Sequence, residues 1–265
     1  MSLAVTILGC GSSAGVPRVG QGWGACDPNN PKNRRRRCSI LVERIGADGE
    51  KTVVLVDMGP DLRNQLLDRD VAHLDAILLT HPHADHTHGI DDVRPLVIQA
   101  KQRIDLHMDV ETSLIVRNHF SYIFETPEGS YYPPLLTEKR LAPGKLCAVK
   151  GPGGAIEAMP FRLEHGEIPS LGFRFGNVAY TPDLNAIPAD SRSYLEDLDL
   201  WIVDALRYTP HPSHFSLPET LDWIERLKPK RAILTNLHCD LDFARLQADL
   251  PENVEPAFDG MQILI

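Results

Sequence analysis

The sequence predicts a layered α/β protein, because short apolar runs typical of strands alternate with helix-like segments along its 265 residues. Each strand-like run ends in a polar or small-residue loop, as expected where strands leave a buried sheet. We found no linker that would divide the chain, so we expect one domain over residues 1–265. The strand-like runs are residues 3–8, 38–45, 52–57, 75–80, 171–180, 199–204, 231–236 and 261–265.

The connections between the early strands differ in character. The first run breaks at a loop of small residues, 9–17, where the backbone could approach a ligand closely. A long connection rich in Gly, Pro, Asn and Arg follows over residues 18–37. Asp61 to Asp70 has the spacing of a helix, with its leucines on one face.

Later segments give both clear and weak signals. Ile90 to Ala100 is expected to be helical, whereas residues 105–150 predict only short elements. Leu217 to Leu227 carries a full set of helix signals, with Ser216 as a possible N-cap and Pro218 in the first turn.

Composition excludes several classes of protein. Hydrophobic residues make up 43% and charged residues 24%, which argues against disorder and fibrous repeats. The net charge of −9 disfavours an extended nucleic-acid-binding surface. Because no stretch is long enough to span a membrane and the first residues lack a basic leader, we expect no membrane association and a cytoplasmic location. The five scattered cysteines lack CxxC pairing and are expected to be reduced.

The densest chemical signal is the hexapeptide His81-Pro82-His83-Ala84-Asp85-His86, which directly follows a strand-like run. A single histidine in such a place is usually a loop or core residue. Four potential ligands within six residues are different, because burying that many titratable groups without a metal would require many hydrogen-bond partners. Imidazole and carboxylate ligands suit zinc, with manganese or iron also possible. We therefore predict a metal site, most simply for two ions.

Two ions need more ligands than the hexapeptide offers, so further His or Asp residues are expected at later strand ends. Three residues fit: His165, Asp183 and His238. Taken one at a time, each could equally be a capping or surface residue in a turn.

With these residues in place, the chain resembles the metallo-β-lactamase superfamily, whose pattern is HxHxDH, a distant His, a distant Asp and a final His. The resemblance runs from the Gly9-Cys10-Gly11-Ser12-Ser13 loop through His238. It implies a four-layered αβ/βα sandwich, with the metals at one edge between two sheets.

The resemblance also implies roles for the individual ligands. His81, His83 and His165 would hold one metal, while Asp85, His86 and His238 would hold the other, and Asp183 would bridge the two. The ions would be two divalent cations, Zn²⁺ or Mn²⁺, activating a water between them.

Within the superfamily, the first loop and His214-Phe215-Ser216 look like the phosphodiesterase branch. That branch includes tRNA 3′-processing endonucleases and phosphoribosyl cyclic phosphate phosphodiesterase, which is closer in size. The latter carries an N-terminal cysteine cluster for a structural zinc, whereas the matching stretch here has Cys26 alone, so a third metal is doubtful. We expect His214 to protonate the leaving oxygen and Asp85 to orient the attacking water, with His211 as the rival to His214.

The leading hypothesis is thus a phosphodiesterase for a small cyclic phosphodiester or a nucleotide. The first alternative is a thioester or lactone hydrolase, because the same metals can activate water against a carbonyl. A tRNA endonuclease ranks lower, since no basic arm is evident. A non-catalytic nucleotide-binding protein would be expected to have lost a ligand. A homodimer is plausible only as a general tendency of enzymes.

The basic run Arg34-Arg35-Arg36-Arg37 has two interpretations. Charge runs are usually solvated loops. The competing hypothesis is that these guanidinium groups contact substrate phosphate.

Overall fold

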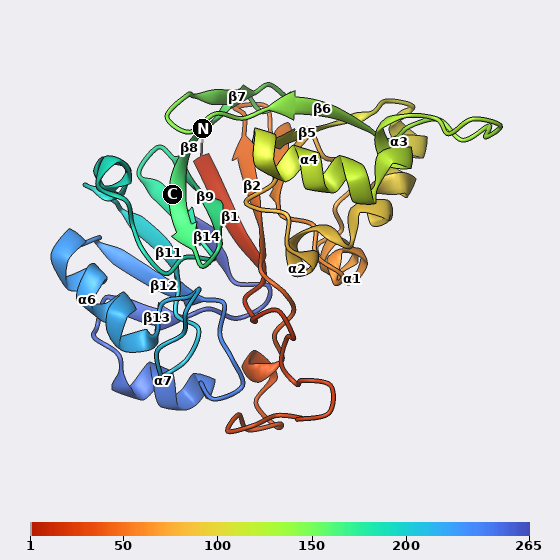
Figure 1. Cartoon of the computed structure of the whole chain (residues 1–265). Coiled ribbons are helices and arrows are strands. Elements are labelled where there is room, and N and C mark those ends of the chain that lie inside the picture. Colours follow the sequence, from red (N-terminus) through yellow and green to blue (C-terminus); the bar gives the residue numbers. More distant parts are fainter. Residues whose placement is uncertain (1) are drawn as a thin grey trace.

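The computed structural model describes residues 2–265, which form four layers: helices, sheet, sheet and helices (Figure 1). Within this range the strands form two sheets of seven. This is the αβ/βα sandwich that the sequence predicted.

The first sheet mixes antiparallel and parallel pairs. Its strands β1 to β3 pair antiparallel, and β3 to β6 pair parallel. In spatial order the sheet is β14 (Gln262–Leu264), β1 (Ser2–Gly9), β2 (Ser39–Ile45), β3 (Lys51–Val56), β4 (Ala76–Leu78), β5 (Ile104–Met108) and β6 (Leu136–Arg140).

The second sheet is built the same way in the opposite order. Strands β7 to β10 pair antiparallel, and β10 to β13 pair parallel. Its order is β13 (Val254–Pro256), β12 (Arg231–Thr235), β11 (Leu200–Asp204), β10 (Val178–Thr181), β9 (Ile168–Phe175), β8 (Ile156–His165) and β7 (Cys147–Val149).

Helices cover the outer face of each sheet. On the first sheet they are α1 (Leu62–Leu67), α2 (Ala84–Thr87), η2 (Ile90–Val93), α3 (Arg94–Ala100), α4 (Val110–His119) and α5 (Ser121–Phe124). On the second they are η3 (Ala189–Leu195), α6 (Leu217–Leu227) and α7 (Phe243–Asp249), while η1 (Pro31–Asn33) lies in the β1–β2 connection.

Alternation along the strands divides the core into three clusters. In β3, Val54 and Val56 face the second sheet, while Val53 and Leu55 face the helices. Successive strand residues point to opposite faces, so a strand buried on both sides is apolar throughout. This explains why the sequence shows continuous apolar runs rather than an apolar–polar alternation.

The predicted start of the helix over residues 217–227 is confirmed. Ser216 caps α6 in a capping box with Glu219. All five cysteines in the described chain are free thiols. No helix within residues 2–265 has the length and apolar character needed to cross a bilayer.

The single strand expected near residues 171–180 is wrong. Gly176, with φ of +59°, makes a turn that splits this run into β9 and β10, which pair antiparallel. The continuous apolar pattern hid the turn, because both strands are buried. Strand β8 and the short β13 have weaker sequence signals and were not predicted.

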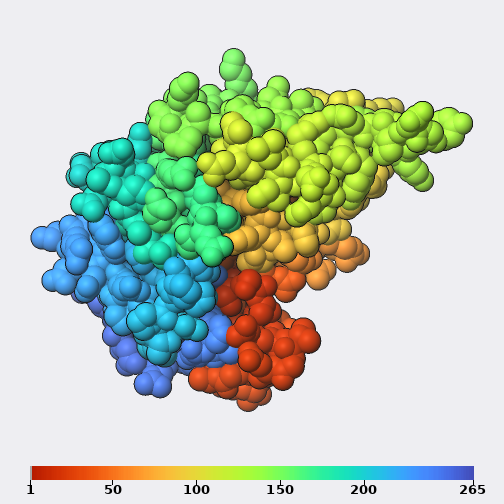
Figure 2. Space-filling model, in the orientation of Figure 1, coloured from red at the N-terminus to blue at the C-terminus, as the bar shows by residue number. Residues whose placement is uncertain are grey.

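The long connection from β1 to β2 lies against the carboxyl-terminal part of the chain (Figures 1 and 2). Asn33 binds the Phe243 N–H and the Asp242 carboxylate, which fastens the connection to the start of α7. Gly9 and Gly11 press on the backbone of Arg35 to Arg37, where a Cβ on Gly9 would lie 2.1 Å from the Arg37 carbonyl oxygen. The small residues of this loop therefore allow close packing against the backbone of residues 35–37 rather than the approach of a ligand.

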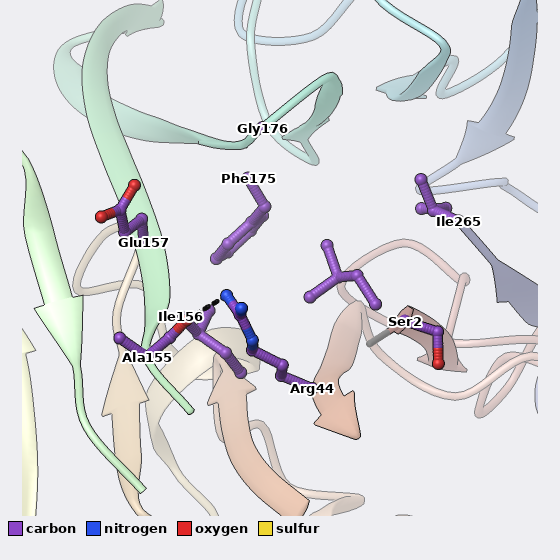
Figure 3. A pocket seen from close by; sticks show the side chains of 9 residues that line it. Ser2, Arg44, Ala155, Ile156, Glu157, Phe175, Gly176 and Ile265 are labelled. Atoms are coloured by element: carbon purple, nitrogen blue, oxygen red, sulfur yellow. Dashed lines mark hydrogen bonds between the residues drawn. The ribbon is translucent and has the colours of Figure 1, made fainter. Parts of the chain in front are cut away.

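A cavity of about 330 Å³ opens at the end of the sandwich where β1 begins and β2 ends (Figure 3). Ser2, Arg44, Glu157 and Phe175 line it, and Arg44 donates to the Ala155 carbonyl oxygen at 2.8 Å. The predicted metal ligands follow the opposite strand ends, so this cavity is separate from them.

Replacing Phe173 by Ala tests the packing between the sheets, because this side chain is fully buried in the central cluster. The free energy of unfolding in urea should fall by about 3–5 kcal/mol, through lost burial and a residual cavity. Val19→Ala, at a fully exposed position, should change it by less than about 0.5 kcal/mol. Equal effects of the two substitutions would contradict this core.

Candidate metal centre

The predicted ligands lie at the strand ends of both sheets, on one edge of the sandwich. His81 and Asp85 follow β4, and His165 is the last residue of β8. Asp183 follows β10, and His238 follows β12. Strands from two sheets thus deliver side chains to one place.

Three histidine nitrogens converge. His83 Nδ1 lies 3.0 Å from His81 Nε2 and 3.2 Å from His165 Nε2. Two ligands of one tetrahedral zinc, each about 2.0–2.1 Å from it, are separated by about 3.3 Å. The spacing of these nitrogens is therefore that of a three-histidine metal site.

A carboxylate connects this group to the next histidine. Asp183 Oδ1 lies 3.3 Å from His86 Nε2, and Asp183 Oδ2 lies 3.7 Å from His165 Nε2 and 3.9 Å from His81 Nε2. Asp85 Oδ2 lies 3.5 Å from His86 Nε2. Asp183 thus stands between the two groups of ligands, where a bridging carboxylate would be needed.

The outer nitrogen of each buried histidine has a fixed partner. The Ser213 carbonyl oxygen lies 2.6 Å from His165 Nδ1, and the carbonyl can only accept, so Nδ1 carries the proton. His86 Nδ1 donates to Asp57 Oδ2 at 2.8 Å, and His81 Nδ1 lies 2.9 Å from Thr80 Oγ1. The Nε2 atoms of His81 and His165 are left with their lone pairs directed at the centre, as metal ligands require. Burial would lower the pKa of His86, but the surrounding carboxylates of Asp183, Asp57 and Asp85 raise it well above its usual range.

The charge state of the three converging histidines agrees with metal binding. Burial lowers the pKa of His81, His83 and His165, which keeps these rings neutral. Burial alone would raise the pKa of Asp183, but His86 and the other histidines hold it well below its usual range. The buried Asp183 Oδ1 makes no hydrogen bond, although it lies within ion-pair distance of His86 Nε2, and a buried carboxylate oxygen without a hydrogen bond is costly. A divalent cation would satisfy it.

Asp57 holds the ring of the candidate ligand His86, and sequence analysis did not single it out. Its buried carboxylate accepts from the Thr80 N–H at 2.8 Å and from Thr80 Oγ1, in addition to His86. Its φ of +64° is unfavourable for a residue with a side chain, so the fold holds it in place. The available signal was its position, directly after the apolar run of β3.

His214 is the other histidine that the structure brings to the centre. Its Nδ1 lies 2.8 Å from Asp204 Oδ2 and 3.8 Å from Asp183 Oδ2. Burial would lower the pKa of His214, but the Asp204 carboxylate outweighs this and raises it to about 9. Asp204, the last residue of β11, was also missed by sequence reasoning, although it ends an apolar run just as Asp57 follows one.

Two predicted residues stand apart. His238 is not part of either group within residues 2–265: its Nε2 faces the Arg18 guanidinium and its Nδ1 faces Asp240. His211 has its ring 5.2 Å from that of His214 and hydrogen-bonds within its own loop to Ser213. The structure thus places His214, not His211, against Asp183.

The basic run is now explained by contacts within the protein. Arg35 is buried and donates to the carbonyl oxygens of His238 and Leu241 at 3.2 and 2.7 Å. Arg36 pairs with Asp68 at 2.6 Å, and Arg37 with Asp61 at 3.1 Å. Arg34 stacks 5.3 Å from the Trp23 ring. The solvated-loop interpretation fits the exposed Arg34 but not the buried Arg35, and contacts within the protein fix the run from Arg35 to Arg37.

Cys26 packs with Val16, Trp23 and Cys239 in a small apolar cluster. Within residues 2–265 it belongs to no group able to hold a metal.

The sequence of this chain is similar to those of known proteins. A family model described as the beta-lactamase superfamily domain matches residues 52–236. The chain belongs to the metallo-β-lactamase superfamily. Its members are mainly hydrolases, in agreement with the histidine and aspartate groups found here.

Solved structures that are similar over nearly the whole chain include the following two. One is a new diphosphatase from the PhnP family, with 34% identity, a TM-score of 0.88, and 100% of this chain and 98% of that chain covered. The other is human tRNase Z, short form, with 20% identity, a TM-score of 0.61 and 98% of each chain covered. The second likeness shows the fold alone.

A curated relative differs in name. An octanoyltransferase of Porphyromonas gingivalis (strain ATCC BAA-308 / W83) is 32% identical over 268 residues, covering 98% of this chain but 51% of that protein. The chain therefore spans about half the length of this relative. The name octanoyltransferase applies to the whole relative, about half of which lies outside the match.

Asp57→Asn tests the support beneath the centre. An amide cannot accept from Thr80 and His86 as the carboxylate does, so His86 loses its fixed tautomer. Zinc affinity, measured by calorimetric titration, should fall roughly 10- to 100-fold. Asp68→Asn, at the surface partner of Arg36, is the matched control and should leave zinc affinity unchanged. Unaltered affinity in Asp57→Asn would show that His86 is not a ligand.

Proposed function

We propose that this protein is a metal-dependent phosphodiesterase that hydrolyses a small cyclic phosphodiester or a nucleotide. The observation that carries the proposal is the His214–Asp204 pair beside Asp183, because a histidine oriented by a buried carboxylate is suited to donate a proton to a leaving oxygen. The similarity to a diphosphatase along the whole chain supports the same class of substrate.

The histidines and aspartates that converge at Asp183 fit a divalent ion, Zn²⁺ or Mn²⁺, and a second ion would require His238 to exchange Arg18 and Asp240 for the metal. His81, His83 and His165 would hold one, Asp85, His86 and His238 the other, and Asp183 would bridge them. When bound, such ions supply an activated water and offset charge on the phosphoryl oxygens. Asp183 is the residue on which both groups of ligands depend.

The protein groups act as follows. Asp204 accepts from His214 Nδ1 at 2.8 Å and from the Leu184 N–H at 3.2 Å, so it fixes the ring next to Asp183. With Nδ1 bound, His214 Nε2 is the atom that can give a proton to the leaving oxygen. Asp85, 3.5 Å from His86, can accept a hydrogen bond from the attacking water and orient it.

Turnover of bis-p-nitrophenyl phosphate and 2′,3′-cyclic nucleotides by zinc- or manganese-loaded protein tests this assignment. Asp183→Ala should abolish metal-dependent cleavage. His214→Ala should lower kcat by about a hundredfold to ten-thousandfold, the usual contribution of a general acid. His211→Ala, in the same loop, should retain most of the activity, and a larger loss there than in His214→Ala would exchange the two roles.

A second candidate is a thioester or lactone hydrolase, favoured by the likeness to a protein named octanoyltransferase. Acyl groups are commonly carried as thioesters, and a two-metal centre can also activate water against a carbonyl. Octanoyl thioester hydrolysis should be measured beside phosphodiester hydrolysis. Rapid thioester cleavage that needs Asp183, with no phosphodiester cleavage, would replace the leading proposal.

Two further hypotheses have less support. A tRNA endonuclease remains a fold-level analogy, since that likeness is 20% identical. A non-catalytic nucleotide-binding protein would require tight nucleotide binding by metal-loaded protein without turnover of any substrate.

A further inference from the structure

Helix α4 presents apolar side chains to solvent and polar ones to the core. Its buried residues are Thr112, Ser113 and Val116. Its exposed apolar residues are Val110, Leu114 and Ile115. A surface helix of a globular protein normally has the opposite arrangement, with its apolar stripe against the core. The helix therefore carries an apolar face that residues 2–265 leave largely uncovered, and Figure 1 shows it at the outside of the molecule.

The polar inner face fixes how the helix is turned. Ser113 Oγ donates to Glu138 Oε1 on β6 at 2.6 Å, and Arg117 Nη1 lies 3.2 Å from Glu138 Oε2. Rotating the helix to bury its apolar side chains would separate Glu138 from both partners, at the cost of two charge-assisted bonds. The exposure of the apolar face is thus built into the fold.

The charges on α4 indicate what covers this face. Asp109 and Glu111 lie at its amino end, whereas Arg117 and His119 lie at its carboxyl end. A second copy of the helix, running antiparallel, would set each acidic end beside a basic end, and the two helix dipoles would attract. A parallel pair would set like charges together. The charge pattern therefore favours a second, antiparallel copy of the same helix.

The exposed positions define how two such helices would meet. They are 110, 111, 114, 115, 118 and 119, which repeat every three to four residues and form one stripe. With a two-fold axis between positions 114 and 115, Leu114 meets Ile115 of the second copy. The same axis places Glu111 opposite Asn118, a neutral residue that can donate a hydrogen bond to it.

A loop beyond α4 enlarges this surface. We call residues 125–135 the arm, which projects from the molecule beyond the carboxyl end of α4 (Figures 1 and 2). The Ser130 N–H donates to the Pro127 carbonyl oxygen at 3.0 Å, so the arm has a turn of its own. Tyr131 is fully exposed and Tyr132 largely so, although aromatic side chains of this size are typical anchors of protein interfaces.

The arm lies where an antiparallel pair would need it. A stable interface buries about 800 Å² on each partner, more than one helix face of three apolar side chains provides. In an antiparallel pair the carboxyl end of one α4 lies beside the amino end of the other. The arm that leaves the carboxyl end would therefore extend over the second copy and add to the buried area.

We propose that α4 and the arm form the interface of a homodimer, in which the α4 helices of two copies pack antiparallel around a two-fold axis. Leu114 and Ile115 lie at its centre, and the arm of each copy lies against the other. This inference concerns assembly and goes beyond the proposed function. It does not depend on which bond the protein cleaves, because no candidate metal ligand belongs to α4 or to the arm.

Sedimentation equilibrium of the full chain over a wide range of concentrations tests the proposal. Wild type should be a dimer that dissociates on dilution. Leu114→Glu should raise the dissociation constant about a thousandfold, because a two-fold axis places the new charge at the centre of the interface twice. Leu264→Glu is the matched control: Leu264 is 71% exposed on β14, Leu114 is 70% exposed, and the control should leave the constant unchanged.

Two further variants keep the test decisive. Leu114→Ala retains a strong helix former, so it should keep the far-ultraviolet circular dichroism of wild type and still raise the dissociation constant about tenfold. Replacing Tyr131 and Tyr132 together by Ser should weaken the dimer by a similar factor. A wild type that is monomeric at every concentration, or a dimer that Leu114→Glu does not weaken, would overturn the interface.

Cross-linking tests the orientation of the helices. Glu111→Cys mixed with Asn118→Cys should give cross-linked dimers with a short bismaleimide, because these positions face each other only in an antiparallel pair. Neither variant alone should cross-link, and wild type is the control, since its own thiols are buried or half-buried. Efficient cross-linking of each variant by itself would show a parallel pair and overturn the antiparallel arrangement.

Discussion

The structure depends above all on one buried carboxylate. Asp183 lies among His81, His86, His165 and His214, and one of its oxygens is buried without a hydrogen-bond partner. A carboxylate removed from water is stable only if cations or donors compensate its charge. The surrounding histidines provide that compensation in part, and a divalent ion would complete it. The two sheets meet at the edge where these side chains can face one another.

Four histidines at this centre share one structural device: His81, His86, His165 and His214. Each ring is held by its outer nitrogen, on Asp57, Thr80, the Ser213 carbonyl or Asp204, so that the inner nitrogen has one direction and one protonation state. Asp57, Thr80 and Asp204 lie at or just after strand ends, where the sheet fixes the backbone, while Ser213 lies in the loop before α6. The backbone of Asp57 is strained by its φ of +64°. Three hydrogen bonds to its carboxylate hold it in this conformation.

Much of the fold was predictable because its signals are local. Apolar runs marked most strands, and Ser216 with Pro218 marked the start of α6. The turn at Gly176 was missed because β9 and β10 are both mostly apolar, and Arg174 and Asn177 are the only residues with long polar side chains between Leu171 and Tyr180. The arginine run shows a different limit: four adjacent guanidinium groups have four different environments, which no local pattern distinguishes.

By itself, the sequence determined the ligand types and their order along the chain. The spacing of His81, His83, Asp85 and His86 is a local property of one loop and identifies metal chemistry without any knowledge of the fold. Only the tertiary structure decided which residues stand behind the ligands. Asp57 and Asp204 lie 29 and 10 positions from their histidine partners, so their roles arise only when the fold brings strand ends and the following loops together. A side chain acquires its chemistry from neighbours in space, and those neighbours are set by packing between the sheets, which sequence spacing does not record.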